Sequence, residues 1–378
     1  MGMQARLWRA LPALGPLVAL VALGAGVVAL PAPALAGGNG VVRVTTTIQA
    51  AVDAAGPGDT VLVPPGTYHE SVLVDKSDLT LRGSRGAVID AHGFANGIRV
   101  GTGEETPGPD GFPVCPPLAL HDVAVEGLTV QNAEDNGLFM TGVDGFSVVG
   151  GSYAGNDQYG VFPSCSTHGV VEGNLAEGAN DTGIYVGNDT DVTVTGNRAA
   201  GNTSGFEVEN SSGVVVRGNR ATGNTAGILV FVLPRLPRTT TDHVLVEGNV
   251  VTRNNRPNPV PPSSGEDLGL VPTGSGILDI AGDDVTFRHN TVVGNDSVGI
   301  AVLATPFAGQ DPRVEPNPDR TAVVGNVILH NGLHPDPLRS GGQAADIVYD
   351  GSGTGNCFAG NVFGTDFPSG IVGLFPCT

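Results

Sequence analysis

Short segments with alternating apolar residues recur along the middle of the chain at an almost constant distance. Each begins with a glycine and an apolar residue, and five in succession, 23, 23, 22 and 22 residues apart, start at Gly137, Gly160, Gly183, Gly205 and Gly227. Two further segments, 23 residues apart, start at Gly276 and Gly299. A fixed period of about 20–50 residues is the sequence signature of repeat proteins. The middle of the chain is therefore predicted to be a repeat.

A second series of short segments runs in phase with the first and mostly ends in Gly-Asn: 192–197, 214–219, 244–249, 285–290 and 321–326. Apolar and variable residues alternate in each, which predicts a strand with one buried face. Gly and Asn tolerate the left-handed backbone of tight turns. A third marker is an asparagine three residues before the next glycine, at Asn180, Asn202 and Asn224.

Each unit of about 22–23 residues therefore holds two short strands and room for a third, with no helical periodicity between them. Short strands without crossover helices cannot form an ordinary parallel sheet. They can if the chain coils, so that each strand pairs with its equivalent one coil later at about 4.8 Å. The predicted fold is an all-β solenoid, a parallel β-helix, in which equivalent asparagines form internal ladders.

A short helix is predicted before the first coil. Thr47 can cap a helix over residues 47–55, and a single apolar stripe is formed by Ile48, Ala51, Val52 and Ala55. The open end of a coil exposes unpaired strand edges and needs such a cover.

Residues 47–55, together with 57–63 and 65–68, resemble the opening of secreted right-handed parallel β-helix proteins of the pectin lyase-like superfamily. The repeats, at 159–163, 183–187, 205–210 and 227–234, resemble a bacterial exported group within it. The resemblance implies a right-handed coil plugged by the helix over residues 47–55. It covers nearly the whole chain after residue 36 and implies no particular activity.

The N-terminus has the features of an export signal. Arg6 and Arg9 precede an apolar stretch over residues 11–30, and Ala34 and Ala36 offer the small residues of a cleavage site. We expect a signal peptide over residues 1–36, cleaved after Ala36, and a single β-helix domain over 37–378 that is secreted or held in the cell envelope. The other interpretation is an uncleaved membrane anchor.

The chain has four cysteines, an even number that suggests two disulfides in an exported protein. Three pairings exist. We favour Cys357–Cys377, which closes a short C-terminal loop, and this leaves Cys115–Cys165.

The 37 acidic residues outnumber the 18 basic ones, and the formal net charge is -19. A nucleic-acid-binding protein needs clustered basic residues, so this class is disfavoured. The same charge should repel acidic membranes, and we expect no membrane contact after signal cleavage. The many carboxylates suit calcium, although no cofactor is specified by a motif.

The Gly-anchored strands should also present an outward column of side chains, because residues alternate between the two faces of a strand. That column contains Phe139, Phe162, Tyr185, Glu207 and Leu229. Sugar rings stack on aromatic faces, so Phe139, Phe162 and Tyr185 are candidate substrate-binding residues. The competing interpretation is that an inserted loop packs over them.

Carboxylates in the same region are candidate catalytic groups. Glu207 and Glu209 lie two apart on one strand, about 7 Å from each other, within the approximate range for inverting glycoside hydrolysis. Asp181 lies at the entrance of the neighbouring strand, and Tyr185 could donate a proton to a substrate. The plainer interpretations are a solvated acidic face or a calcium site. Asp279 should point inward, either at a bulge or as a buried acid with a partner.

Insertions rich in Pro, Gly and Ser adjoin the Gly-anchored strands at 101–118, 232–242, 255–275 and 303–320. Loops of this length tend to carry function, and these should emerge along the borders of one sheet. Two hypotheses follow. The protein is an exported carbohydrate-active lyase, epimerase or hydrolase that works in a groove on that sheet, or a noncatalytic extracellular protein that binds a glycan or another partner.

Overall fold

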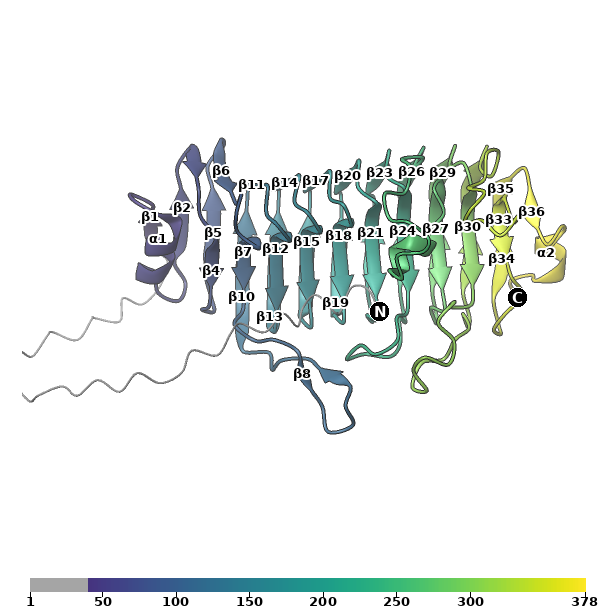
Figure 1. The fold of residues 1–378 in the computed structure, drawn as a ribbon, viewed down its shortest axis with the longest axis horizontal. Coiled ribbons are helices and arrows are strands. Elements are labelled where there is room, and N and C mark those ends of the chain that lie inside the picture. Colours follow the sequence, from purple (N-terminus) through teal and green to yellow (C-terminus); the bar gives the residue numbers. More distant parts are fainter. Residues whose placement is uncertain (1–39) are drawn as a thin grey trace, which may run out of the picture.

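The computed structural model describes residues 40–378, and the predicted signal peptide lies outside them. The described chain winds into a long coil whose strands form three parallel sheets of 12, 11 and 11 strands (Figure 1). This confirms the predicted parallel β-helix, with three strands in each regular coil. No described helix is long and apolar enough to cross a membrane.

The first sheet contains, in order, β1 (Val41–Arg43), β2 (Thr60–Val63), β5 (Thr80–Gly83), β10 (Leu120–Glu126), β13 (Val143–Val149), β16 (Thr167–Glu172), β19 (Thr190–Thr195), β22 (Val215–Arg217), β25 (Leu245–Glu247), β28 (Thr286–Arg288), β31 (Ala322–Val324) and β34 (Cys357–Ala359). The second contains β3 (Gly66–Tyr68), β6 (Ala87–Asp90), β11 (Thr129–Gln131), β14 (Ser152–Ala154), β17 (Leu175–Glu177), β20 (Arg198–Ala200), β23 (Arg220–Thr222), β26 (Val250–Thr252), β29 (Thr291–Val293), β32 (Val327–Leu329) and β35 (Val362–Phe363).

The third sheet carries the predicted outward column. Its strands are β4 (Val72–Val74), β7 (Asn96–Val100), β12 (Asn136–Thr141), β15 (Tyr159–Ser164), β18 (Thr182–Gly187), β21 (Ser204–Glu209), β24 (Ala226–Phe231), β27 (Ser275–Ile280), β30 (Val298–Leu303), β33 (Ala345–Tyr349) and β36 (Asp366–Phe367). A small antiparallel hairpin, β8 (Thr106–Pro107) and β9 (Pro113–Val114), projects from the connection between β7 and β10 (Figure 1).

Side chains that point into the coil stack on their equivalents in the next coil. In the third sheet Ile184 pairs with Phe206, Phe206 with Ile228, and Ile228 with Ile277. All four are at most 1% exposed. The last pair is 49 residues apart in sequence and still lies in register, because the long connections leave and rejoin the coil at equivalent points.

Asparagines at the corners form ladders inside the coil. Asn197, Asn219 and Asn249 are successive members of one ladder, in which each side-chain amide donates to the carboxamide oxygen of the next at 3.0–3.1 Å. The residue before each is a glycine at φ +64°, so the glycine takes the left-handed turn and the asparagine reaches inward. A second ladder includes Asn202 and Asn224.

Asn180 does not belong to the second ladder, contrary to the sequence prediction. Its side chain is exposed and donates to Asp157, while the N–H of Ala179 faces the Asn202 carboxamide. The turn before β18 is shifted by one residue, because the β17–β20 pairing runs at a 23-residue offset and the β18–β21 pairing at 22.

The leading glycines of the third sheet are required by a close approach between coils. A Cβ at Gly160 would lie 2.4 Å from the carbonyl oxygen of Gly183, and one at Gly205 would lie 2.6 Å from that of Gly227. Any other residue would force the coils apart at this corner.

Both ends of the coil are covered. At the N-terminal end, helix α1 (Ile48–Ala54) buries Ile48 and Val52, and the Thr47 hydroxyl accepts from the Ala50 N–H, as predicted. At the other end, the short helix α2 (Ile371–Leu374) buries Ile371 (Figure 1).

The disulfides are those favoured from the sequence. Cys357–Cys377 closes the C-terminal turn beside α2, and Cys115–Cys165 ties the β7–β10 connection to the end of β15. No free cysteine remains among residues 40–378.

Asn219→Ala should destabilise the protein by at least about 2 kcal/mol, because it leaves buried partners in both neighbouring coils without a hydrogen bond. Thermal and denaturant melts measure the change. The matched control is Asn180→Ala, an exposed asparagine, which should change stability by less than about 0.5 kcal/mol. Equal effects of the two substitutions would contradict a structural role for the ladder.

Candidate functional site

The predicted outward column exists on the outer face of the third sheet, but most of it is covered. Pairing places Phe139 beside Phe162, and Tyr185 beside Glu207 and then Leu229. Phe139 and Phe162 are half-buried, whereas Tyr185, Glu207 and Leu229 are only 2–4% exposed. The expected open groove is therefore closed over part of its length.

The aromatic members of the column form a cluster at one end of this covered region. The Phe139 and Phe162 ring centroids are 5.1 Å apart, and those of Phe162 and Tyr185 are 4.6 Å apart at 83°. Tyr159, which the sequence analysis did not select, packs against Phe162 at 4.6 Å and Tyr185 at 5.0 Å. The Arg99 guanidinium lies 5.6 Å from the Phe139 ring centroid. We call these five residues the aromatic cluster.

The three predicted catalytic carboxyl groups lie next to the aromatic cluster and are buried. Glu207 and Glu209 project from β21, and Asp181 comes directly before β18; their exposures are 2%, 2% and 7%. Tyr185 is also close, and the hydrogen bond from its hydroxyl to Glu209 lowers the pKa of that carboxyl group. We call Asp181, Glu207 and Glu209 the acid cluster.

Burial raises the pKa of every member of the acid cluster. For Asp181 it raises the pKa from 3.8 to about 7, while hydrogen bonds from Thr182 and Tyr159 act in the opposite direction. Burial also raises the pKa of Glu207, as do the charges of Asp181 and Glu209. Burial likewise raises the pKa of Glu209. A carboxyl group that titrates near neutral pH can both give and take a proton.

Two oxygens of the acid cluster have no hydrogen-bond partner among the described residues, Glu207 Oε1 and Glu209 Oε2. An unpartnered buried polar atom is rare in native structures because it loses its hydration without compensation. Both atoms therefore have spare capacity to bond a group that enters the site.

The cover over the acid cluster comes from residues 253–274, which connect β26 to β27 and which we call the covering loop. Its short 3-10 helix η2 (Asp267–Leu270) places Leu268 against the sheet. With Leu229, Phe231 and Leu278 of the sheet it forms a second hydrophobic cluster, outside the coil. The predicted alternative, a loop packed on the column, thus holds for its C-terminal half.

Sequence reasoning missed two acids that complete the surroundings of the acid cluster. Asp267 of the covering loop and Glu105 of the β7–β10 connection both raise the pKa of Glu209 through their charge. Burial raises the pKa of each as well. Their segments have no strand periodicity, so only their position in the insertions could have drawn attention to them.

The structure settles the environment of Asp279. It lies in regular pairing between Val230 and Val302, without a bulge, and is fully buried. Its carboxylate accepts hydrogen bonds from the Gly282 N–H at 2.9 Å and the Thr321 hydroxyl at 2.5 Å. Burial raises the pKa of this group to about 7. It is a partnered acid inside the coil, away from the outer face.

Two groups of acids and histidine have ligand atoms within 4.8 Å of one another in the described part of the chain: Asp78, His121 and Asp122, and Asp283, Glu315 and Asp319. Neither group includes a member of the acid cluster. Calcium at the acid cluster stays a prediction.

The sequence matches the family model of the right-handed β-helix region over residues 92–232 and 136–309. The chain belongs to this family, and its coil is right-handed. No curated protein sequence matches it significantly.

Solved structures share this fold at low sequence identity. The A-module of mannuronan C-5 epimerase AlgE6 from Azotobacter vinelandii is 18% identical, with a TM-score of 0.59 over 83% of this chain and 90% of that chain. The AlgE4 A-module from the same organism is 16% identical, with a TM-score of 0.52 over 87% and 95%. A family 28 exopolygalacturonase from Yersinia enterocolitica is 12% identical, with a TM-score of 0.51 over 86% and 78%.

The raised pKa of Asp181 predicts a loss of stability with rising pH. The folded protein holds a proton that the unfolded chain releases between about pH 4 and 7, so stability falls as pH rises through this window. One such group contributes up to about 1.4 kcal/mol per pH unit. Asp181→Asn should flatten the dependence of the denaturation midpoint on pH.

The control for this experiment is Asp157→Asn, because Asp157 is exposed and occupies the turn one coil earlier. Its pH dependence should equal that of the unchanged protein. An Asp181→Asn profile as steep as the control would mean that Asp181 is ionised in the folded protein at neutral pH.

Proposed function

We propose that this protein is exported and acts on a polysaccharide that lies along the aromatic cluster. The observation that carries the proposal is the position of Asp181, a carboxyl group with a pKa of about 7, beside stacked rings on one sheet face. Aromatic rings offer flat apolar faces on which sugar rings can stack, and a carboxyl group that titrates near neutral pH serves acid–base chemistry.

The residues take different roles in this proposal. Phe139 and Phe162 are half-buried and supply the exposed edge on which a sugar stacks. Asp181 transfers the proton, and its pKa is held high by burial and by the charges of Asp267 and Glu266. Glu207 and Glu209, whose own pKa values the charge of Asp181 raises, stand as partner acids. Tyr185 connects the two clusters and orients Glu209. The reaction class is lyase, epimerase or hydrolase, each of which needs a proton donor or acceptor at the sugar.

The comparisons support a polysaccharide as the partner at a general level. Two of the proteins that share the fold are named for mannuronan epimerisation and polygalacturonan cleavage. Identities of 12–18% relate the folds and leave the substrate and the reaction to experiment.

Export is also part of the proposal. The two disulfides suit an extracellular or periplasmic compartment, because thiols stay reduced in the cytosol. The predicted cleavage after Ala36 would deliver the protein there.

A noncatalytic glycan-binding protein is the second candidate. It is favoured by the burial of the acid cluster, whose members are only 2–7% exposed beneath inserted loops. In this case the aromatic cluster binds the glycan and the acids do no chemistry.

The two candidates are separated by incubating the protein with alginate, polygalacturonate and neutral glycans. Ultraviolet absorbance of unsaturated products detects a lyase, new reducing ends detect a hydrolase, and uptake of deuterium from heavy water detects an epimerase. Asp181→Asn should lower turnover at least about a hundredfold, and Asp157→Asn should leave it unchanged. Phe162→Ala should weaken binding of the glycan.

Binding without any of the three products would support the noncatalytic candidate. Turnover by Asp181→Asn at the rate of the unchanged protein would remove Asp181 from the mechanism. A protein that neither binds nor alters any glycan would contradict the proposed function altogether.

A further inference from the structure

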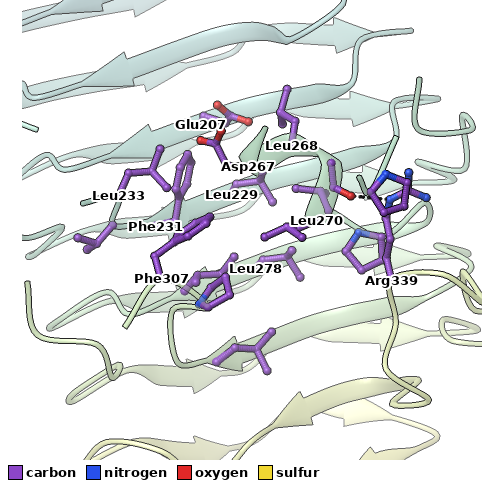
Figure 2. Close-up of a pocket in the computed structure, with 18 of the residues that line it drawn as sticks. Glu207, Leu229, Phe231, Leu233, Asp267, Leu268, Leu270, Leu278, Phe307 and Arg339 are labelled. Carbon is purple, nitrogen blue, oxygen red and sulfur yellow. Dashed lines mark hydrogen bonds between the residues drawn. The ribbon is translucent and has the colours of Figure 1, made fainter. Parts of the chain in front are cut away.

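A pocket of about 400 Å³ lies on the outer face of the third sheet, beneath the covering loop (Figure 2). Pockets that bind small molecules commonly measure about 300–1,000 Å³. The floor is formed by Leu229 and Leu278, and the loop contributes Leu268. Phe231 and Phe307 stand at one side (Figure 2). The lining is therefore dominated by large apolar side chains.

The pocket opens to the surface at its rim. Leu270 and Leu338 both line it, and they are also 44% and 72% exposed. Exposed leucines at the edge of an apolar cavity leave a path for a molecule with apolar surface. The floor of the pocket lies on β24 and β27, whereas Phe139 and Phe162 of the aromatic cluster lie on β12 and β15 of earlier coils.

The lining includes one charged group whose bonds are already satisfied. Arg339 pairs with Asp336 at 2.9 Å and donates to the carbonyl oxygens of Gly269 and Val260 at 2.8 and 2.7 Å. It ties the loop over residues 330–344 to the covering loop and so helps to hold the wall in place. It offers no free charge to an anionic ligand.

Glu207 forms the opposite, acidic end of the pocket (Figure 2). Its side chain is 2% exposed, and its Oε1 has no hydrogen-bond partner among the described residues. Asp267 lines the same end of the pocket. When they are ionised, two carboxyl groups in this position accept from a hydroxyl or amino donor and repel a carboxylate, and a bound donor would oppose the burial that raises the pKa of Glu207.

We propose that this pocket binds a small amphipathic molecule, whose apolar body lies between the sheet and the covering loop and whose hydroxyl or amino end donates to Glu207 Oε1. A polysaccharide does not fit this pocket, because its hydroxyl groups would lose water against leucine and phenylalanine side chains without new partners. The apolar part of the pocket is thus separate from the aromatic cluster, and the pocket shares Glu207 with the acid cluster. It can exist whether or not the protein acts on a glycan.

The probe is N-phenyl-1-naphthylamine, an apolar fluorophore with one N–H donor, which is added to the full mature protein. The competitors are used at concentrations below those at which they form micelles. Its fluorescence should rise saturably to one equivalent. Dodecanol and dodecylamine should displace it at concentrations at least about tenfold below those required of dodecanoate. Comparison of dodecanol with dodecylamine also shows whether the site prefers a neutral or a cationic donor.

Leu303→Trp should fill the pocket, because Leu303 lines it and is only half-buried, so that the larger ring has room to turn inward. The probe should then bind at least about tenfold more weakly. The matched control is Leu333→Trp, at a leucine that is 62% exposed and outside the lining, and it should bind as the unchanged protein does. Melting curves show that both variants fold.

Glu207→Leu should retain binding of the probe and lose the preference for dodecanol and dodecylamine over dodecanoate. Equal displacement by all three competitors in the unchanged protein would overturn the assignment of the donor end. A probe signal that does not saturate, or equal binding by the two tryptophan variants, would overturn the pocket itself.

Discussion

Register between coils is the constraint on which the rest of this structure depends. Each buried asparagine obtains its hydrogen bonds from the coils before and after it, as Asn219 does from Asn197 and Asn249. The leading glycines bring neighbouring coils so close that a side chain would collide with a carbonyl oxygen. A coil of different geometry would leave its neighbours with unpaired polar groups in a closed interior. Long insertions are tolerated only because they leave and rejoin at equivalent points.

This constraint acts on the interior and leaves the outer face free to vary from coil to coil. Along one outward column the residues change from Phe162 through Tyr185 and Glu207 to Leu229 while the backbone pairing continues. Differences along the column therefore create distinct surfaces on a uniform scaffold. Aromatic rings gather at one end, an apolar pocket forms at the other, and the acid cluster lies where the two meet.

The repeat could be predicted from the sequence because the interior demands the same residue types in every coil. The outward column followed from strand alternation, which is why Tyr185 and Glu207 were placed side by side correctly. Their burial could not be predicted, because it depends on how residues 253–274 fold back onto the sheet, and that segment has no periodicity. Asp267 joins the site from 60 positions beyond Glu207 for the same reason. Asn180 was misplaced because one turn is a residue longer, which spacing between glycines does not reveal.

The acid cluster is not required by the coil that carries it. Glu207 pairs with Tyr185 on one side and Leu229 on the other, and Glu209 pairs with Gly187 and Phe231. Uncharged residues thus occupy the same two positions in both adjacent coils, with the same backbone. Burial of carboxyl groups without a cationic partner destabilises a protein, and apolar side chains of similar size would pack against the covering loop without that penalty. Buried groups with strongly shifted pKa values concentrate at functional sites. The stability lost at Glu207 and Glu209 therefore favours a role in binding or proton transfer over a role in the architecture.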